Sequence, residues 1–365
     1  MAKLGEVCLL KAGKFVSAND ISPEYNKGLY PCFGGNGIRG YVADYTHDGE
    51  FPLIGRQGAL CGNVNLASGK FHATEHAVVV QPKIEMNVHW LYYALNAMNL
   101  GQYATGAAQP GLAVSKLETL SIEIPNISEQ NKIAQTLYKV EQLVNFRKQQ
   151  LVKLDELVKA RFVEMFGTFP ANPFRWSIGK IQDVVSDVRY GSSRPAVEGG
   201  KYPYLRMNNI TYSGELDLRD TKRIDIPDSE LDKCTVRRGD VLFNRTNSKE
   251  LVGKTCVYNR DELMVLAGFV IRVRINERIR PEVLSAFLNM DFSKRMLIGM
   301  CKTAIGQANI NAKELQNIDL YIPPIELQDQ FVTLKNKIDQ QKQTVQQSLE
   351  KLELLKKALM QEYFG

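Results

Sequence analysis

Two short strings in the sequence contain residue types that catalytic sites use. His72, Glu75 and His76 fit the pattern H-x-x-E-H, which holds a zinc ion when the histidines lie one helical turn apart. This string runs directly into the apolar residues 77–80, and the combined run is typical of a strand. Four residues along a strand separate two imidazoles by ~13 Å, which is too far for one ion. The pattern therefore argues against a zinc site.

The second string, Gly253-Lys254-Thr255, is similar to the end of a phosphate-binding loop. The first glycine of such a loop would be residue 248, which is Ser248. The chain also lacks the Asp/Asn-Pro-Pro-aromatic string that amino-methylating enzymes use and a set of residues for nucleotide hydrolysis. We therefore expect a protein that is not an enzyme and that binds no cofactor itself.

The remaining chemistry is hydrogen bonding and positive charge on loops. Arg and Lys pair with guanine, Asn and Gln pair with adenine, and lysines also suit phosphates. Any one of these residues can be an ordinary solvated loop side chain, so the groups 206–209 and 244–248 carry more weight. The candidates for DNA binding are Arg39, Arg56, Gln57, Asn63, Lys70, Gln109, Arg189, Arg194, Arg206, Asn208, Asn209, Arg245, Asn247, Lys249, Gln307 and Asn309.

The positive charge of the chain is unevenly placed. The net charge is +6, and residues 168–304 hold 23 basic and 17 acidic side chains, whereas residues 1–112 are neutral. A basic globular segment suggests a polyanionic partner, nucleic acid first. The six cysteines form no CxxC pair, and no apolar run approaches the ~18 residues of a membrane span. These features predict a cytoplasmic protein with reduced thiols and no membrane partner.

The elements that must position these residues are repeated. The sequence pattern of residues 124–167 is repeated at residues 322–365, at a constant offset of 198 residues without a gap. Both copies end in Phe-Gly. Apolar residues in the second copy recur every seventh position from Phe331 to Leu359, and the first copy alternates four- and three-residue steps from Ile133. This period is the seam of a coiled coil. About 38 helical residues at ~1.5 Å each would give a rod of roughly 57 Å.

Two matching rods in one chain most simply pack on each other, although each could instead lie on its own domain as an ordinary amphipathic helix. Four seam positions are polar, namely Arg147, Arg161, Gln341 and Ser348. Such residues set helix register or face another protein.

The globular segments follow one plan with different content. Each reads as a mixed, strand-rich domain with glycine turns, and helices are expected at residues 87–98 and 281–297. The predicted fold class is α+β, with two mixed domains joined and spaced by two long antiparallel coiled-coil helices. The predicted boundaries are 1–125 and 126–167 for the first domain and helix, and 168–323 and 324–365 for the second.

This arrangement resembles the specificity subunit of type I restriction–modification enzymes. One departure is that the second helix has Leu327-Gln328 where the first has Glu129-Gln130. The strings that carry the resemblance are Leu4-Gly5-Glu6-Val7, Tyr30-Pro31, Gly55-Arg56-Gln57-Gly58, Cys61-Gly62-Asn63-Val64, Thr74-Glu75-His76-Ala77, Ile124-Pro125, Glu129-Gln130, Trp176, Tyr202-Pro203, Arg238-Gly239-Asp240-Val241-Leu242, residues 303–307 and Ile322-Pro323-Pro324.

The resemblance implies a non-catalytic reader of double-stranded DNA. Each domain would be a target-recognition domain for one half of a bipartite site, and the helices would fix the spacer between the halves. The implied partners are two adenine-methyltransferase subunits, which bind S-adenosylmethionine, and restriction or translocase subunits that use ATP and Mg. Base chemistry would then belong to the partners.

Two readings from other classes stay open. One is a metal-dependent hydrolase that uses His72 and His76, which would contain bound zinc. The other is a coiled-coil interaction protein whose domains bind protein, so that its DNA affinity would be weak and indifferent to sequence.

Gln109 and Gln307 occupy equivalent positions in the segments that precede the two long helices. We expect Gln109→Ala to impair recognition of one half-site only, because each domain reads its own half. Binding to duplexes mutated in either half-site measures this, and an equal loss at both halves would contradict the two-reader arrangement.

Overall fold

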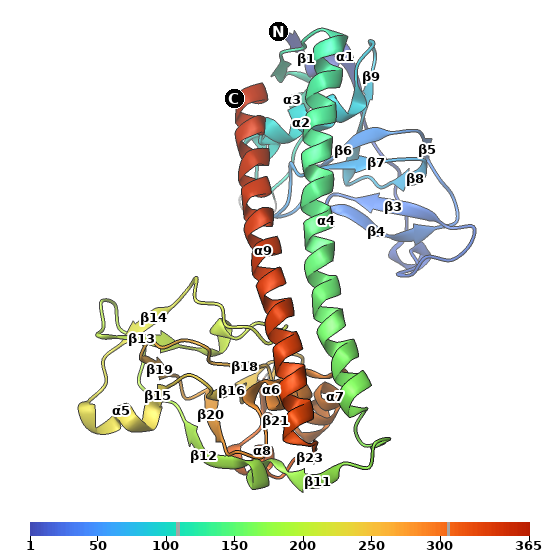
Figure 1. The fold of residues 1–365 in the computed structure, drawn as a ribbon. Coiled ribbons are helices and arrows are strands. Elements are labelled where there is room, and N and C mark those ends of the chain that lie inside the picture. Colours follow the sequence, from blue (N-terminus) through green and yellow to red (C-terminus); the bar gives the residue numbers. More distant parts are fainter. Residues whose placement is uncertain (107–109, 305–306) are drawn as a thin grey trace. The chain divides into compact units, whose positions relative to one another are not determined.

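The computed structural model describes residues 1–106, 110–304 and 307–365, and the chain divides into two compact units. The first unit contains Met1–Lys148 and Gln347–Gly365, and the second contains Gln149–Gln346. Two 40-residue helices, α4 (Ile127–Phe166) and α9 (Ile325–Phe364), each begin in one unit and end in the other (Figure 1). The predicted α+β class and both unbroken helices are confirmed. None of the described helices is long and apolar enough to cross a membrane.

Two four-stranded sheets and one strand pair make up the β-structure of the first unit. One sheet is antiparallel and has the order β2 (Cys8–Ala12), β9 (Ala77–Pro82), β6 (Phe51–Gly55) and β7 (Val64–Ala67). The other has the order β4 (Gly37–Val42), β3 (Tyr30–Gly34), β8 (Lys70–Ala73) and β5 (His47–Asp48), and its β3 and β8 are parallel. The short pair is β1 (Ala2–Lys3) with β10 (Ser121–Ile122).

The second unit repeats this topology. Its antiparallel sheet has the order β12 (Val185–Tyr190), β20 (Val270–Ile275), β16 (Val241–Asn244) and β18 (Thr255–Val257). Its mixed sheet has the order β14 (Lys222–Ile224), β13 (Tyr202–Leu205), β19 (Met264–Leu266) and β15 (Thr235–Val236), again with its two middle strands parallel. The short pair is β11 (Ser177–Lys180) with β23 (Asp319–Ile322). The internal repeat therefore extends from the helices to the sheets.

The second unit also has a helix, α5 (Asp228–Cys234), for which the described part of the first unit has no counterpart. It further has a small sheet of β17 (Thr246–Asn247), β22 (Gln307–Asn309) and β21 (Lys302–Ala304), where the described part of the first unit has single backbone bridges from Gly111 to Gln57 and to Thr105. The two domains thus share a scaffold and differ in what is added to it.

Short helices repeat as well, with one difference from the sequence prediction. The matching pairs are α1 (Leu4–Val7) with the 3₁₀ turn η3 (Ile181–Val184), α2 (Val88–Ala97) with α6 (Pro281–Asn289), and α3 (Val114–Glu118) with α8 (Ala312–Gln316). The single helix expected over residues 281–297 is wrong. Met290 is extended, and α7 (Asp291–Met300) begins with an aspartate, whose negative charge suits a helix N-terminus.

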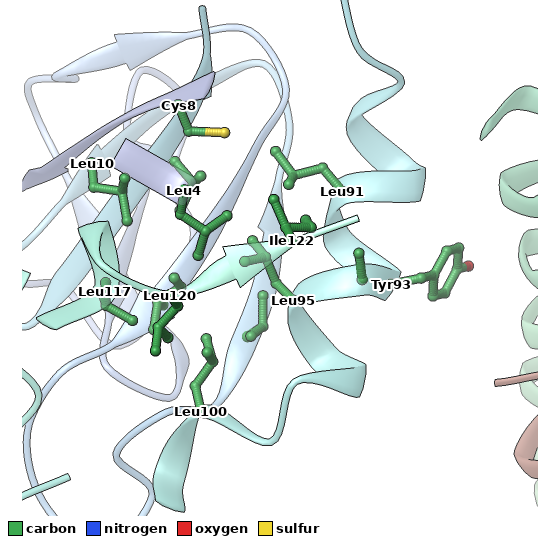
Figure 2. Packing of buried hydrophobic residues seen from close by; sticks show 14 of the residues in the cluster. Leu4, Cys8, Leu10, Leu91, Tyr93, Leu95, Leu100, Leu117, Leu120 and Ile122 are labelled. Atoms are coloured by element: carbon green, nitrogen blue, oxygen red, sulfur yellow. The ribbon is translucent and has the colours of Figure 1, made fainter. Parts of the chain in front are cut away.

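The core of each unit contains pieces of both long helices. In the first unit, α1, α2, α3 and β10 bury Leu4, Leu91, Leu117 and Ile122 against one another (Figure 2). Ile133 and Leu137 from the start of α4 join this cluster, and the end of α9 packs on it, with the ring of Phe364 6.4 Å from that of Trp90.

In the second unit the roles of the two helices are exchanged. Phe331 from the start of α9 lies among Phe162 and Phe166 from the end of α4, with ring centroids 5.4–5.6 Å apart. Burying one such side chain stabilises the fold by roughly 1.5–3 kcal/mol. Each core is therefore completed by the helix that leaves its domain and by the helix that arrives from the other.

The coiled-coil seam is largely as predicted. Ile133, Leu137, Val140, Val144, Phe331, Ile338 and Val345 are buried. Lys356 pairs with Glu141 at 2.7 Å and Lys148 with Glu353 at 2.9 Å in the first unit, and Lys342 pairs with Asp155 in the second. Residue numbers rise along α4 as they fall along α9, so the helices are antiparallel.

Two of the predicted polar seam positions, Gln341 and Arg161, are exposed, and Lys342, which follows Gln341, is buried. Burial alone disfavours its ammonium group, but hydrogen bonds to Asp155 and Glu215 outweigh this and raise the pKa of Lys342. No local sequence pattern indicates these partners, because they lie far from Lys342 along the chain.

A buried glutamine docks each long helix on the domain that precedes it. The Gln130 side chain accepts from the backbone N–H of Asn87 at 2.9 Å and donates to the Pro125 carbonyl at 2.8 Å. Its counterpart Gln328 accepts from the Arg280 N–H and donates to the Pro323 carbonyl, both at 2.8 Å. Asn87 and Arg280 are the N-cap residues that immediately precede α2 and α6. The glutamines therefore satisfy backbone groups that would otherwise be buried without partners.

We expect Gln328→Ala to lower the free energy of unfolding by about 1–3 kcal/mol, because it leaves these buried backbone groups unpaired. Urea unfolding with the exposed Gln330→Ala variant as control measures the difference. Equal stability of the two variants would contradict this role of Gln328.

Candidate nucleic-acid interface

Arg56 and Arg245 occupy the same place in the two domains. Each follows the strand that lies third in its antiparallel sheet, β6 or β16. The Arg56 N–H donates to the His76 carbonyl at 3.0 Å, and its carbonyl accepts from Leu112 at 2.9 Å. Arg245 makes the same two bonds, to Phe269 at 3.0 Å and from Ile310 at 2.9 Å. The backbone therefore presents both arginines in one way.

The surroundings of Arg245 are polar and aromatic. Its guanidinium carbon lies 4.9 Å from the centre of the Tyr190 ring, and Nη2 donates to Oδ1 of Asn309 at 3.0 Å. Pairing of β17 with β22 places Asn247 opposite Ala308, next to Asn309. The structure thus brings Arg245, Asn247 and Asn309 together. The backbone of Gln307 belongs to β22.

The predicted group at residues 206–209 is also a built loop, but its members differ in role. Asn209 is 2% exposed, accepts from the Arg206 N–H at 2.8 Å and donates to the Asp217 carbonyl at 2.8 Å. Its amide therefore shapes the loop. Arg206 is half-buried and pairs with Asp220 at 2.9 Å, while Asn208 is exposed.

Arg189 and Arg194 are exposed and already neutralised by carboxylates. Arg189 pairs with Asp187 at 2.9 Å, and Arg194 pairs with Glu230 at 2.7 Å. The hydrogen bond from Arg194 lowers the pKa of the Glu230 carboxyl, so the pair stays ionised at neutral pH. Lys249 is exposed on the loop that follows Asn247.

The candidates of the first domain lie on strands and on turns. Arg39 on β4, Gln57 and Asn63 are exposed, and Asn63 donates to Oδ1 of Asn36 at 2.7 Å. Lys70 lies 4.7 Å from the centre of the Tyr45 ring, and its hydrogen bond with Tyr45 raises the pKa of the ammonium group. Gln57 pairs with Gly111 through a backbone bridge. Gln109 lies outside the described residues.

The catalytic-looking strings have structural roles. Residues 72–76 form the end of β8 and a tight turn, so the prediction of one continuous strand is wrong; the Thr74 carbonyl closes the turn by accepting from Ala77. His72 donates from Nε2 to the Lys14 carbonyl at 3.2 Å. Within residues 1–106, 110–304 and 307–365, no group of three or more His, Cys, Asp or Glu is placed to hold a metal ion. Lys254 is buried and donates to the Met207 carbonyl at 3.0 Å.

Tyr190 and Lys294 are not among the candidates that the sequence predicted. Tyr190 directly follows the candidate Arg189, so an aromatic residue beside a cationic loop was the available signal. Lys294 donates from Nζ to the Gly253 carbonyl at 2.5 Å. Burial, with smaller contributions from Lys159 and Lys254, lowers the pKa of Lys294 to about 7. No local pattern marks this residue, because its burial comes from the packing of α7.

We expect Lys294→Met to be more stable than the parent at pH 7, by an amount of the order of 2 kcal/mol, and this gain to shrink towards pH 10. Between a folded pKa of about 7 and an unfolded value near 10.4, the unfolded chain binds more protons, so stability of the parent rises with pH. Below the folded pKa both states are protonated and the burial cost is complete.

Urea unfolding at the two pH values measures this gain, with the exposed Lys313→Met variant as a control that should show no such dependence. A gain that is the same at pH 7 and pH 10 would contradict a shifted pKa at Lys294.

Comparisons with known proteins agree with the repeated architecture. The family described as Type I restriction modification DNA specificity domain matches residues 1–156 and 175–354. The type I restriction enzyme EcoprrI specificity subunit of Escherichia coli is 53% identical over 143 residues, which are 39% of this chain and 36% of that protein. The EcoKI specificity subunit of Escherichia coli strain K12 is 22% identical over 260 residues, 67% of this chain and 56% of that protein.

The matches therefore span between about a third and just over half of the length of these two relatives. Among solved structures, the S subunit of the type I restriction-modification system from M. genitalium has a TM-score of 0.64 at 18% identity, covering 100% of this chain and 95% of that chain. This likeness shows that the two chains share a fold.

Proposed function

Because the chain belongs to the Type I restriction modification DNA specificity domain family, we propose that it is the sequence-specific DNA-binding subunit of a type I restriction–modification complex and reads a bipartite site. The observation that carries this proposal is the pair of similar scaffolds that differ in detail. The described part of the first unit has no counterpart of α5, and it has single backbone bridges at Gly111 where the second unit has the β17–β22–β21 sheet. Two such domains suit two different half-sites.

The target-recognition domains in this proposal are residues 1–125 and 168–323, and the helices at 126–167 and 324–365 set the spacer between the half-sites. The predicted loop residues are the proposed contacts, with Asn209 shaping its loop rather than touching DNA. Arg245, Asn247 and Asn309 are the best supported group, because they lie together and Tyr190 orders the guanidinium.

The proposed partners are double-stranded DNA, two adenine-methyltransferase subunits and restriction or translocase subunits. Leu157 on α4 and Leu355 on α9 occupy equivalent positions and are 41% and 45% exposed. Exposed apolar residues at matching positions suit two copies of one partner.

The chain itself is proposed to be non-catalytic and to bind no cofactor, while S-adenosylmethionine, ATP and Mg belong to the partners. Six free cysteines, five of them buried, support a cytoplasmic location.

The test is selection from a pool of random duplexes by the chain assembled with its methyltransferase partner, followed by sequencing of the bound fraction. We expect two short, different sequences separated by a fixed spacer, because two dissimilar domains read them. Recovery of no common sequence would contradict DNA reading and favour domains that bind protein.

A further inference from the structure

The backbone holds the two equivalent arginines in closed loops. Gly55 donates to the Asn63 carbonyl at 2.8 Å and accepts from Gly62 at 2.7 Å, which closes residues 56–62. Asn244 donates to the Lys254 carbonyl and accepts from Gly253, both at 2.8 Å, which closes residues 245–253 in the same way.

Gly62 and Gly253 both have positive φ, +89° and +79°, at the closing position of these loops. Only glycine adopts this conformation readily, so both loops depend on it. The loops differ in length and in most residues, yet each begins with arginine. The arginine at the start and the glycine at the close are therefore the features that the two loops share.

Both arginines lack an acidic partner among the described residues. Arg245 contacts neutral groups, namely the Tyr190 ring, Oδ1 of Asn309 and the Gly268 carbonyl. The Nε atoms of Arg56 and Arg245 are buried without a hydrogen-bond partner in the described structure. Arg189, Arg194, Arg206 and Arg238, by contrast, each pair with a carboxylate. A half-buried guanidinium without a counter-ion attracts an anion.

The equivalent positions of Arg56 and Arg245 indicate which anion the two arginines bind. The two half-sites of a bipartite sequence differ in their bases and have the phosphate backbone in common. A residue that occupies the same position in two otherwise different domains suits a contact with the phosphate backbone, which both half-sites have. Base contacts are expected from the loops that differ between the domains. The acceptors beside Arg245 are neutral, which also leaves its charge available to a phosphate.

We propose that Arg56 and Arg245 are a matched pair of DNA phosphate contacts, one for each half-site, that position the two domains without reading bases. This inference rests on the proposed function. Base reading then falls to residues that differ between the two domains, such as those of the Arg206–Asn208 loop and Asn309, which stands where the first domain has Gly111.

The experiment uses the chain assembled with its methyltransferase partner, a duplex with the selected bipartite site, and a duplex of equal length with both half-sites scrambled. Dissociation constants are measured between ~50 and ~200 mM salt. We expect Arg56→Gln and Arg245→Gln each to reduce the slope of log affinity against log salt by about 0.9, so that the loss over this range becomes three- to four-fold smaller. Both duplexes should weaken by the same factor, and the selected sequence should stay unchanged.

Conservative and matched variants separate charge from geometry and from folding. Arg56→Lys and Arg245→Lys keep the charge and should retain the parent slope, since a phosphate accepts from either cation whereas a base-reading fork needs arginine. Arg238→Gln removes an exposed arginine that pairs with Asp261 at 2.8 Å and should leave the slope unchanged. Thermal unfolding of each variant identifies any that is misfolded, and the lysine variants then decide the question.

Three outcomes would overturn the inference. Loss of sequence preference in one half-site would make the arginine a base reader. An unchanged slope together with loss of methyltransferase assembly would make the pair a protein contact. Failure of the parent complex to prefer the selected duplex over the scrambled one would overturn the proposed function and this inference together.

Discussion

Antiparallel packing of two copies of one helix is the constraint on which the rest of the structure depends. The start of each helix is fixed to its own domain by a buried glutamine, Gln130 or Gln328. The end of each helix supplies aromatic residues to the other core, with Phe166 in the second unit and Phe364 in the first. Neither core is complete without both helices, so each domain depends on both helices for its packing.

This scaffold allows the domains to diverge. The order of strands, the parallel middle pair and the short strand pair are the same in both units. Within the described structure α5 occurs in the second unit alone, and the β17–β22–β21 sheet of that unit corresponds to single backbone bridges at Gly111 in the first. Equivalent backbone bonds still hold Arg56 and Arg245 at one position. In the proposed function, the shared groups suit the phosphate backbone that the two half-sites have in common, and the elements that differ suit the different bases.

The sequence predicted most of the scaffold, because periodicity and internal repetition are local signals. The seven-residue period gave both helices, and the offset of 198 residues gave their pairing. The sequence did not predict the break between α6 and α7 at Met290, the turn at residues 74–76 or the burial of Lys342. Each of these is decided by contacts with segments that are distant along the chain.

The candidate interface was predictable only as residue types on loops. Asn209 shows the limit, since its sequence neighbourhood is that of a base contact while its amide is used inside the loop. Tyr190 and Asn309 show the converse, because they meet Arg245 from segments far away in the chain. The sequence shows which chemical groups the side chains carry, whereas only the fold shows which groups contact one another.

The central claim is that the helix pair fixes the distance between two half-sites. The most direct measurement is the affinity of the assembled complex for duplexes that carry both half-sites with spacers varied one base pair at a time. One base pair moves a half-site by ~3.4 Å and turns it by ~36°, so a rigid spacer predicts a single optimum with much weaker binding on either side. Equal affinity at every spacer length would contradict the account.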